Sequence, residues 1–138
     1  MAKPVVLDST AVLAVLFDEP GAGSVIDMLQ DSLLSSVSLA EIHSRLLANG
    51  NPSAQAWNRL LSLGFEVVPF SDEQARLAGE FVLLLGELPG NSRPQRLSLA
   101  ERACLALALE RDATVYTTNR AWKNMPKPAA NLDVVVIA

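Results

Sequence analysis

Short apolar runs alternate along this chain with longer segments whose apolar residues recur at helical spacing. The runs of strand length lie at residues 5–7, 33–37, 65–70, 113–117 and 134–137. Most of them are continuous rather than alternating, which is typical of strands buried on both faces of a parallel sheet. Helical segments between strands provide the crossovers that such a sheet needs. The pattern predicts an α/β, three-layer fold with a central parallel β-sheet flanked by helices.

The length and composition fit a single compact domain spanning residues 1–138. Half of the chain is hydrophobic and 19% is charged, which excludes a disordered protein. No uncharged apolar run approaches the ~18 residues that a membrane span requires, and Asp8 interrupts any secretory signal near Lys3. The single cysteine, Cys104, lies among alanines and leucines. We therefore expect a cytoplasmic protein with a buried, unreactive thiol.

The formal net charge of −4 argues against nucleic-acid binding through bulk charge. A polyanionic partner would need a local basic patch. Two groups of basic residues are available, although such groups most often form a solvated face. They are Arg93, Arg96 and Arg102 in one group and Arg120, Lys123 and Lys127 in the other.

Asp8 stands where the first apolar run ends and a helical pattern begins. Two interpretations are open for this carboxylate. Asp8 or Ser9 could be the N-cap of the helix, accepting hydrogen bonds from its free N–H groups. Alternatively, Asp8 could belong to a site beyond the carboxyl end of the strand, where parallel α/β sheets bind ligands.

The tetrapeptide Ser-Leu-Ala-Glu occurs twice, at residues 38–41 and 98–101. Serine followed three residues later by glutamate is the pattern of a capping box, and it predicts a helix start at both places. Glu41 and Glu101 also follow strand or loop segments, as Asn119 follows the run at 113–117. Each is therefore a candidate for the same edge of the sheet as Asp8.

Carboxylates gathered at one sheet edge remain ionised together only when a cation lies between them. Oxygen ligands of this kind suit Mg²⁺, or Mn²⁺ as a second possibility. Zinc is disfavoured because the sequence offers one histidine, His43, and one cysteine. The sequence thus predicts a magnesium site formed around Asp8.

Four motifs together resemble the PIN-domain ribonucleases, and among these the VapC-type toxins of bacterial toxin–antitoxin pairs. They are Val-Leu-Asp-Ser-Thr-Ala at 6–11, Ser-Leu-Ala-Glu at 38–41, the segment at 97–108, and Thr-Asn-Arg-Ala-Trp at 118–122. The resemblance covers nearly the whole chain. It implies a PIN-like, Rossmann-like sheet, Mg²⁺-dependent cleavage of RNA, a homodimer, and a cognate antitoxin as partner.

Residue by residue, the resemblance assigns Asp8 and Glu41 to the first two acids of the family. Glu101 stands where the family generally has aspartate, and Asn119 where it usually has a fourth aspartate. The longer acid could shift the metal, and the neutral amide should weaken metal binding. A PIN domain that binds without cutting is therefore an alternative.

The mechanism that these residues suggest is hydrolysis of an RNA phosphodiester by a metal-activated water. Asp8 and Glu101 would hold the metal, with water-mediated help from Glu41 and Asn119. The residues expected to contact substrate are Ser9, Thr118, Arg93, Arg96 and Arg120. A haloacid-dehalogenase-like phosphatase is a further alternative, but Thr10 stands where that family needs its second aspartate.

Overall fold

The computed structural model describes residues 3–81, 97–124 and 132–137. Within these ranges the strands are β1 (Val5–Leu7), β2 (Ser32–Ser35), β3 (Glu66–Val68), β4 (Thr114–Thr117) and β5 (Asp133–Val136). The α-helices are α1 (Ser9–Leu16), α2 (Ala22–Ile26), α3 (Ser36–Ala48), α4 (Ser53–Leu61), α5 (Asp72–Glu80) and α6 (Leu99–Arg111). Two short 3₁₀ helices, η1 (Leu29–Asp31) and η3 (Arg120–Asn124), complete the described elements.

The five strands form one sheet in the order β3-β2-β1-β4-β5, and every pairing between neighbours is parallel. This confirms the predicted α/β fold. The chain builds the sheet outward from β1 to β2 and β3, and then crosses to the other side of β1 to form β4 and β5. The direction of construction thus reverses between β1 and β4, which is the position where open parallel sheets bind ligands.

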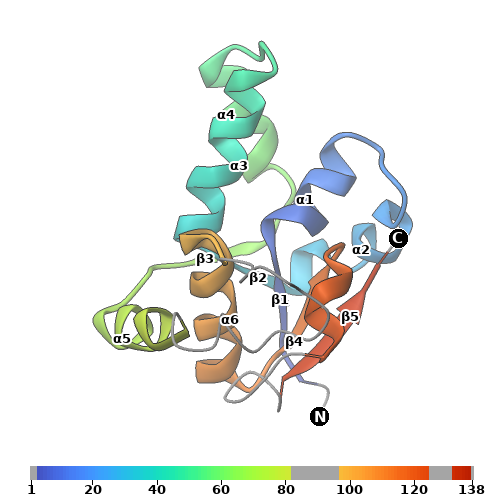
Figure 1. Cartoon of the computed structure of the whole chain (residues 1–138). Helices are drawn as coiled ribbons and strands as arrows, with labels where there is room; N and C mark the ends of the chain where they lie inside the picture. Colours follow the sequence, from blue (N-terminus) through green and yellow to red (C-terminus); the bar gives the residue numbers. More distant parts are fainter. Residues whose placement is uncertain (1–2, 82–96, 125–131, 138) are drawn as a thin grey trace, which may run out of the picture.

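Helices cover both faces of the sheet, with α1 and α2 on one side and α5 and α6 on the other (Figure 1). Adjacent residues of β1 show why both faces are apolar, because consecutive strand side chains point to opposite faces. Leu7 packs in the core with α1 to α4, and Val6 packs in the core with α5 and α6. The segment at 97–108 is apolar nearly all round, which predicts a central, buried helix. α6 carries seven buried residues and confirms this prediction.

The start of α3 differs from the prediction. β2 ends at Ser35, whose hydroxyl accepts a hydrogen bond from the Val37 N–H, and α3 begins at Ser36. The strand expected at 33–37 is therefore present as β2 but ends at Ser35, and the capping box expected at 38–41 is wrong. Strand pairing ends two residues earlier than the apolar run, so the first available hydroxyl becomes the cap and Ser38 lies within the first turn.

Two predicted features lie outside the described residues, in part or completely. In the sequence, Ser71 followed by two acids and Gln74 predicts a helix start and a helix to about Gly86. α5 begins after Ser71, whose hydroxyl accepts from the Gln74 N–H, and ends at Glu80, and residues 82–86 lie outside the described ranges. The segment at 87–96, whose Pro, Gly, Asn, Ser and Arg residues predict a long loop, falls completely outside the described residues. Across the described ranges, no helix combines the length and the apolar character needed to cross a membrane.

Candidate active site

Asp8 lies at the carboxyl end of β1 and is almost completely buried, with 2% of its surface exposed. Its Oδ1 accepts hydrogen bonds from the Ala11 N–H at 2.9 Å and from the Thr10 hydroxyl at 2.6 Å. Asp8 is thus the N-cap of α1, and of the two capping candidates the aspartate, rather than Ser9, takes this role. Capping does not consume the carboxylate, because Oδ2 faces the neighbouring strand.

Thr117, the last residue of β4, donates its hydroxyl hydrogen to Asp8 Oδ2 at 2.6 Å. Both threonines that bind Asp8 are themselves fixed by backbone donors. The N–H of Thr118 donates to the Thr10 hydroxyl oxygen, and the N–H of Asn119 donates to that of Thr117. Neither threonine was predicted to be a site residue. For Thr10 the signal was its position two residues after the aspartate, whereas Thr117 is brought close only by the pairing of β1 with β4.

Burial raises the pKa of the Asp8 carboxyl above its ordinary value, and the charge of Glu101 raises it further. The hydrogen bonds from Thr10, Thr117 and Ala11 oppose this rise by stabilising the ionised form. A carboxylate that is buried beside a second carboxylate benefits from a cation in the same space.

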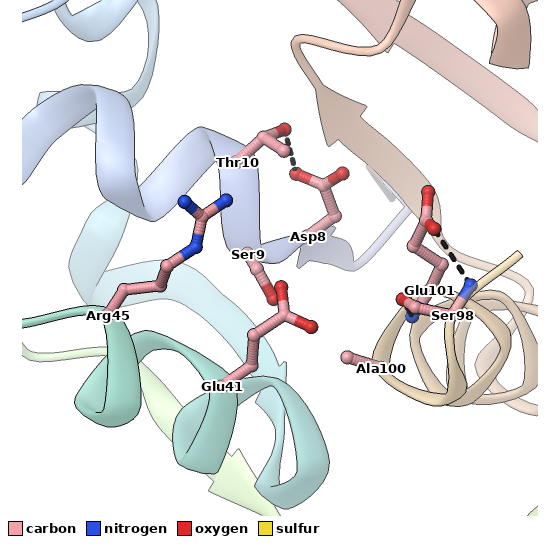
Figure 2. Close-up of a pocket in the computed structure, with 8 residues that line it drawn as sticks. All are labelled: Asp8, Ser9, Thr10, Glu41, Arg45, Ser98, Ala100 and Glu101. Atoms are coloured by element: carbon pink, nitrogen blue, oxygen red, sulfur yellow. Dashed lines mark hydrogen bonds between the residues drawn. The ribbon is translucent and has the colours of Figure 1, made fainter. Parts of the chain in front are cut away.

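Glu41 lies inside α3, just over one turn from its start. Because Ser35 caps the helix, Glu41 is not engaged in the capping box predicted for it. Its carboxylate faces the same space as Asp8 and Ser9 in Figure 2. One helical turn further on the same face lies Arg45. It was not among the predicted site residues, although its i, i+4 spacing from Glu41 places it beside that residue.

The second Ser-Leu-Ala-Glu segment forms the predicted capping box at the start of α6. The Ser98 hydroxyl accepts from the Glu101 N–H at 3.1 Å, and Glu101 Oε1 accepts from the Ser98 N–H at 2.9 Å. Glu101 Oε2 accepts a hydrogen bond from Asn119 Nδ2 at 3.4 Å. Asn119 Oδ1 in turn accepts from the Ala121 N–H. That backbone donor fixes the amide with its NH₂ group toward Glu101.

These groups surround a cavity of about 440 Å³ at the carboxyl end of the sheet (Figure 2). We call it the carboxylate cavity. Three acids from three separate elements line it, and its full lining is Asp8, Ser9, Thr10, Glu41, Arg45, Ser98, Ala100 and Glu101. The structure thus brings Asp8, Glu41 and Glu101 to one space, whereas Asn119 contacts Glu101 from outside this lining.

The residues expected to contact substrate fall into three groups. Ser9 lines the carboxylate cavity, and Thr118 lines a neighbouring one. Arg120 is exposed in η3 and lines neither cavity. Arg93 and Arg96 lie outside the described residues. Arg102, grouped with them in the sequence, donates a hydrogen bond to the Ala78 carbonyl and joins α6 to α5.

The donor set fits a hard divalent cation that retains water. Two carboxylate oxygens offer about four acceptor positions; the hydrogen bonds to Asp8 use both on Oδ1 and one on Oδ2. Asp8 Oδ2 and both oxygens of Glu101 therefore retain free lone pairs. Among the described residues, no three His, Cys, Asp or Glu side chains are grouped closely enough to enclose an ion alone. Such an open set suits Mg²⁺, which is usually held by one or two carboxylates and several waters.

The fold and the position of this cavity define an α/β protein with an acidic site at the point where the strand order reverses. The family model of the PIN domain matches residues 5–128. The chain therefore belongs to the PIN domain family, as the sequence motifs indicated, and this replaces the haloacid-dehalogenase-like alternative. No curated protein matches the chain in sequence.

Solved structures from toxin–antitoxin systems share this fold at low sequence identity. VapBC2 from Rickettsia felis, bound to a promoter DNA fragment, matches with a TM-score of 0.68 and 18% identity, over 97% of this chain and 98% of the other. A toxin–antitoxin complex from Klebsiella pneumoniae gives 0.65 and 18% over 96% of each chain. VapBC-5 from Mycobacterium tuberculosis gives 0.59 and 19% over 99% of each chain.

Proposed function

We propose that this protein is a Mg²⁺-dependent endoribonuclease of the toxin type. The observation that carries the proposal is the convergence of Asp8, Glu41 and Glu101 on one cavity at the carboxyl end of the sheet. A binding module has no need of acids gathered around one cavity, whereas carboxylates there can hold the divalent cation through which a phosphodiester is hydrolysed. Membership of the PIN family and the resemblance to VapC-type toxins support RNA as the substrate.

Asp8 and Glu101 are the residues that would hold Mg²⁺, or Mn²⁺ in its place. When bound, the ion would lower the pKa of a coordinated water and neutralise charge on the phosphate. The hydroxyls of Thr10 and Thr117 hold the Asp8 carboxylate in one position in the lining of the cavity. Glu41, free of a capping role, is available to accept a proton from a water, and Ser9 to donate a hydrogen bond to a phosphate oxygen.

The test is cleavage of single-stranded RNA by purified protein, freed of any partner, in Mg²⁺ or Mn²⁺. We expect cleavage by the wild type, none in EDTA, and none by Asp8→Asn. Asp112→Asn is the matched control, because Asp112 lies at the opposite end of α6 and its left-handed backbone (φ 48°) suits asparagine. Cleavage by Asp8→Asn at the wild-type rate would overturn the proposed site. Single-stranded DNA of the same sequence tests the choice of RNA.

The second candidate is a PIN domain that binds RNA or a protein without cutting. The observation that favours it is Asn119, which is neutral and whose carbonyl oxygen is engaged by Ala121. A wild type that binds RNA but leaves it intact at every metal concentration would establish this alternative.

The proposal includes a cognate antitoxin, a homodimer and a cytoplasmic location. The similar structures named above come from toxin–antitoxin systems, which supports the antitoxin. Exposed apolar side chains on the α3–α4 hairpin, namely Leu47, Trp57 and Leu61, support a protein contact there. A search for a small antitoxin-like gene immediately upstream tests the antitoxin. The mass of the purified protein in solution tests the homodimer.

A further inference from the structure

A second cavity, of about 290 Å³, adjoins the carboxylate cavity and shares Thr10 and Arg45 with it. We call it the side cavity. Its lining is Thr10, Leu13, Phe17, Glu19, Arg45 and Thr118. Thr10, Leu13 and Phe17 follow one face of α1, and at 1.5 Å per residue they extend about 10 Å from the site. The side cavity thus adjoins the carboxylate cavity and extends from it along α1.

Arg45 is the cation at the junction of the two cavities. Arg59 and Arg102 donate to backbone carbonyls, and Arg76 and Arg111 pair with carboxylates. Arg45, by contrast, makes no side-chain hydrogen bond or ion pair within the described residues. Figure 2 shows its guanidinium reaching from α3 toward α1, beside the carboxylates. An arginine without a protein partner in an otherwise acidic site is suited to a phosphate group.

Phe17 and Glu19 define the far end of the side cavity. Phe17 follows the last turn of α1, and 39% of its surface is exposed. An exposed aromatic ring in the lining of such a cavity offers a stacking surface for a base. Glu19 repels a phosphate at that end, so a neutral base fits there better than a backbone phosphate does.

We propose that the side cavity is a nucleotide subsite next to the scissile bond, in which Arg45 binds the adjoining phosphate and Phe17 stacks on the base. This inference rests on the proposed function for the identity of the polymer. It adds a second contact region to the substrate, separate from the carboxylates. Phe17 and Arg45 then determine how tightly RNA is held and which nucleotide is placed beside the cut.

The test measures binding rather than cleavage. A short, fluorescently labelled single-stranded RNA is titrated with Asp8→Asn protein in EDTA, and anisotropy gives the affinity. Phe17→Ala, Arg45→Gln and the control Arg111→Gln are compared in this same background. Arg111→Gln makes the same charge change at the far end of α6. Thermal unfolding of each variant verifies that it is folded.

We expect Phe17→Ala to weaken binding about tenfold, within the range of a lost base stack. The salt dependence of RNA affinity should be the same with and without Phe17→Ala. The same comparison is made with a set of RNAs, each of which lacks the base at a different single position. For the RNA that lacks the base stacked on Phe17, proteins with the wild-type side chain and with alanine at position 17 should bind equally well. Arg45→Gln should reduce the slope of log affinity against log salt by about 0.7, the value for one phosphate contact to a single strand. Arg45→Lys should restore most of that slope.

Two results would overturn the subsite. One is an effect of Phe17→Ala that is equal on every abasic RNA, and the other is a salt slope for Arg45→Gln identical to that of Arg111→Gln. Failure of the subsite is distinguishable from failure of the proposed function. Wild-type cleavage with normal binding by Phe17→Ala and Arg45→Gln rejects the subsite alone, whereas the expected binding pattern with no wild-type cleavage rejects the nuclease alone.

Discussion

The hydroxyl of Thr117 donates to the buried Oδ2 of Asp8 at 2.6 Å, and this hydrogen bond joins the ends of β1 and β4. The two residues are 109 positions apart in the chain. The position of the Asp8 carboxylate therefore depends on the pairing of two distant strands, and not only on the helix that Asp8 caps.

Thr117→Val should destabilise the protein. Valine has nearly the same shape as threonine but leaves Asp8 Oδ2 buried without its donor, which costs about 2 kcal/mol of unfolding free energy. Urea denaturation measures the change. Thr114→Val in the same strand is the control, because the Thr114 side chain makes no hydrogen bond within the described residues. Equal effects of the two substitutions would show that the bond to Asp8 contributes little.

Asp8→Asn should flatten the pH dependence of stability in metal-free buffer. Burial raises the pKa of Asp8 in the folded state, so the native protein binds more protons than the unfolded chain once the pH exceeds about 3.8. Stability from this group then falls as the pH rises through the folded pKa. Unfolding free energies in EDTA between pH 4 and 7 should decline more steeply in the wild type than in Asp8→Asn. Equal slopes of unfolding free energy against pH for the two proteins would contradict a raised pKa for Asp8.

Asn119→Asp should increase the protein's dependence on metal. The new carboxylate would face Glu101 Oε2, which now accepts a hydrogen bond from the amide, so repulsion should lower the melting temperature in EDTA. Added Mg²⁺ should reverse this loss and should reach half-maximal activity at a lower concentration than in the wild type. Asn119→Ala removes the hydrogen bond without adding charge. It should lower the melting temperature in EDTA only slightly, and it should not lower the Mg²⁺ concentration needed for half-maximal activity.

Cys104 should resist thiol reagents until the protein unfolds. The thiol is completely buried in α6, and burial together with the charges of Asp8 and Glu101 raises its pKa well above 9.0. The reactive thiolate is therefore disfavoured in the native state. A colorimetric thiol assay at pH 8 should detect no free thiol in native protein and one per chain in denaturant. Rapid labelling of native protein would show that α6 opens locally.

The alternation of strands and helices was readable from the sequence because both periodicities are local. The position of Asp8 at a strand end was readable for the same reason. Which of Ser35, Ser36 and Ser38 caps α3 could not be predicted from the sequence, because the end of β2 is set by its pairing with β1 and β3. This determines that the same four residues, Ser-Leu-Ala-Glu, form a capping box before α6 and leave the glutamate uncommitted in α3.

The hydrogen-bond partners of the site residues were the hardest feature to predict from the sequence. Thr117 and Asn119 reach Asp8 and Glu101 only through the sheet and through the packing of α6 beneath it. The cavities themselves have no sequence signal, since their linings combine separate segments near residues 8–19, 41–45, 98–101 and 118. Arg45 was recognisable in principle from its spacing to Glu41, but its lack of a protein partner is visible only in three dimensions.

The hydrogen bond between Thr117 and Asp8 has a consequence during synthesis of the chain. Asp8 is synthesised about one hundred residues before the strand that holds its carboxylate in place. Glu101 is also made late, so a nascent chain carries Asp8 and Glu41 without the rest of the site. We therefore expect ribosome-bound fragments that end before β4 to be inert, and activity to require the synthesis of β4.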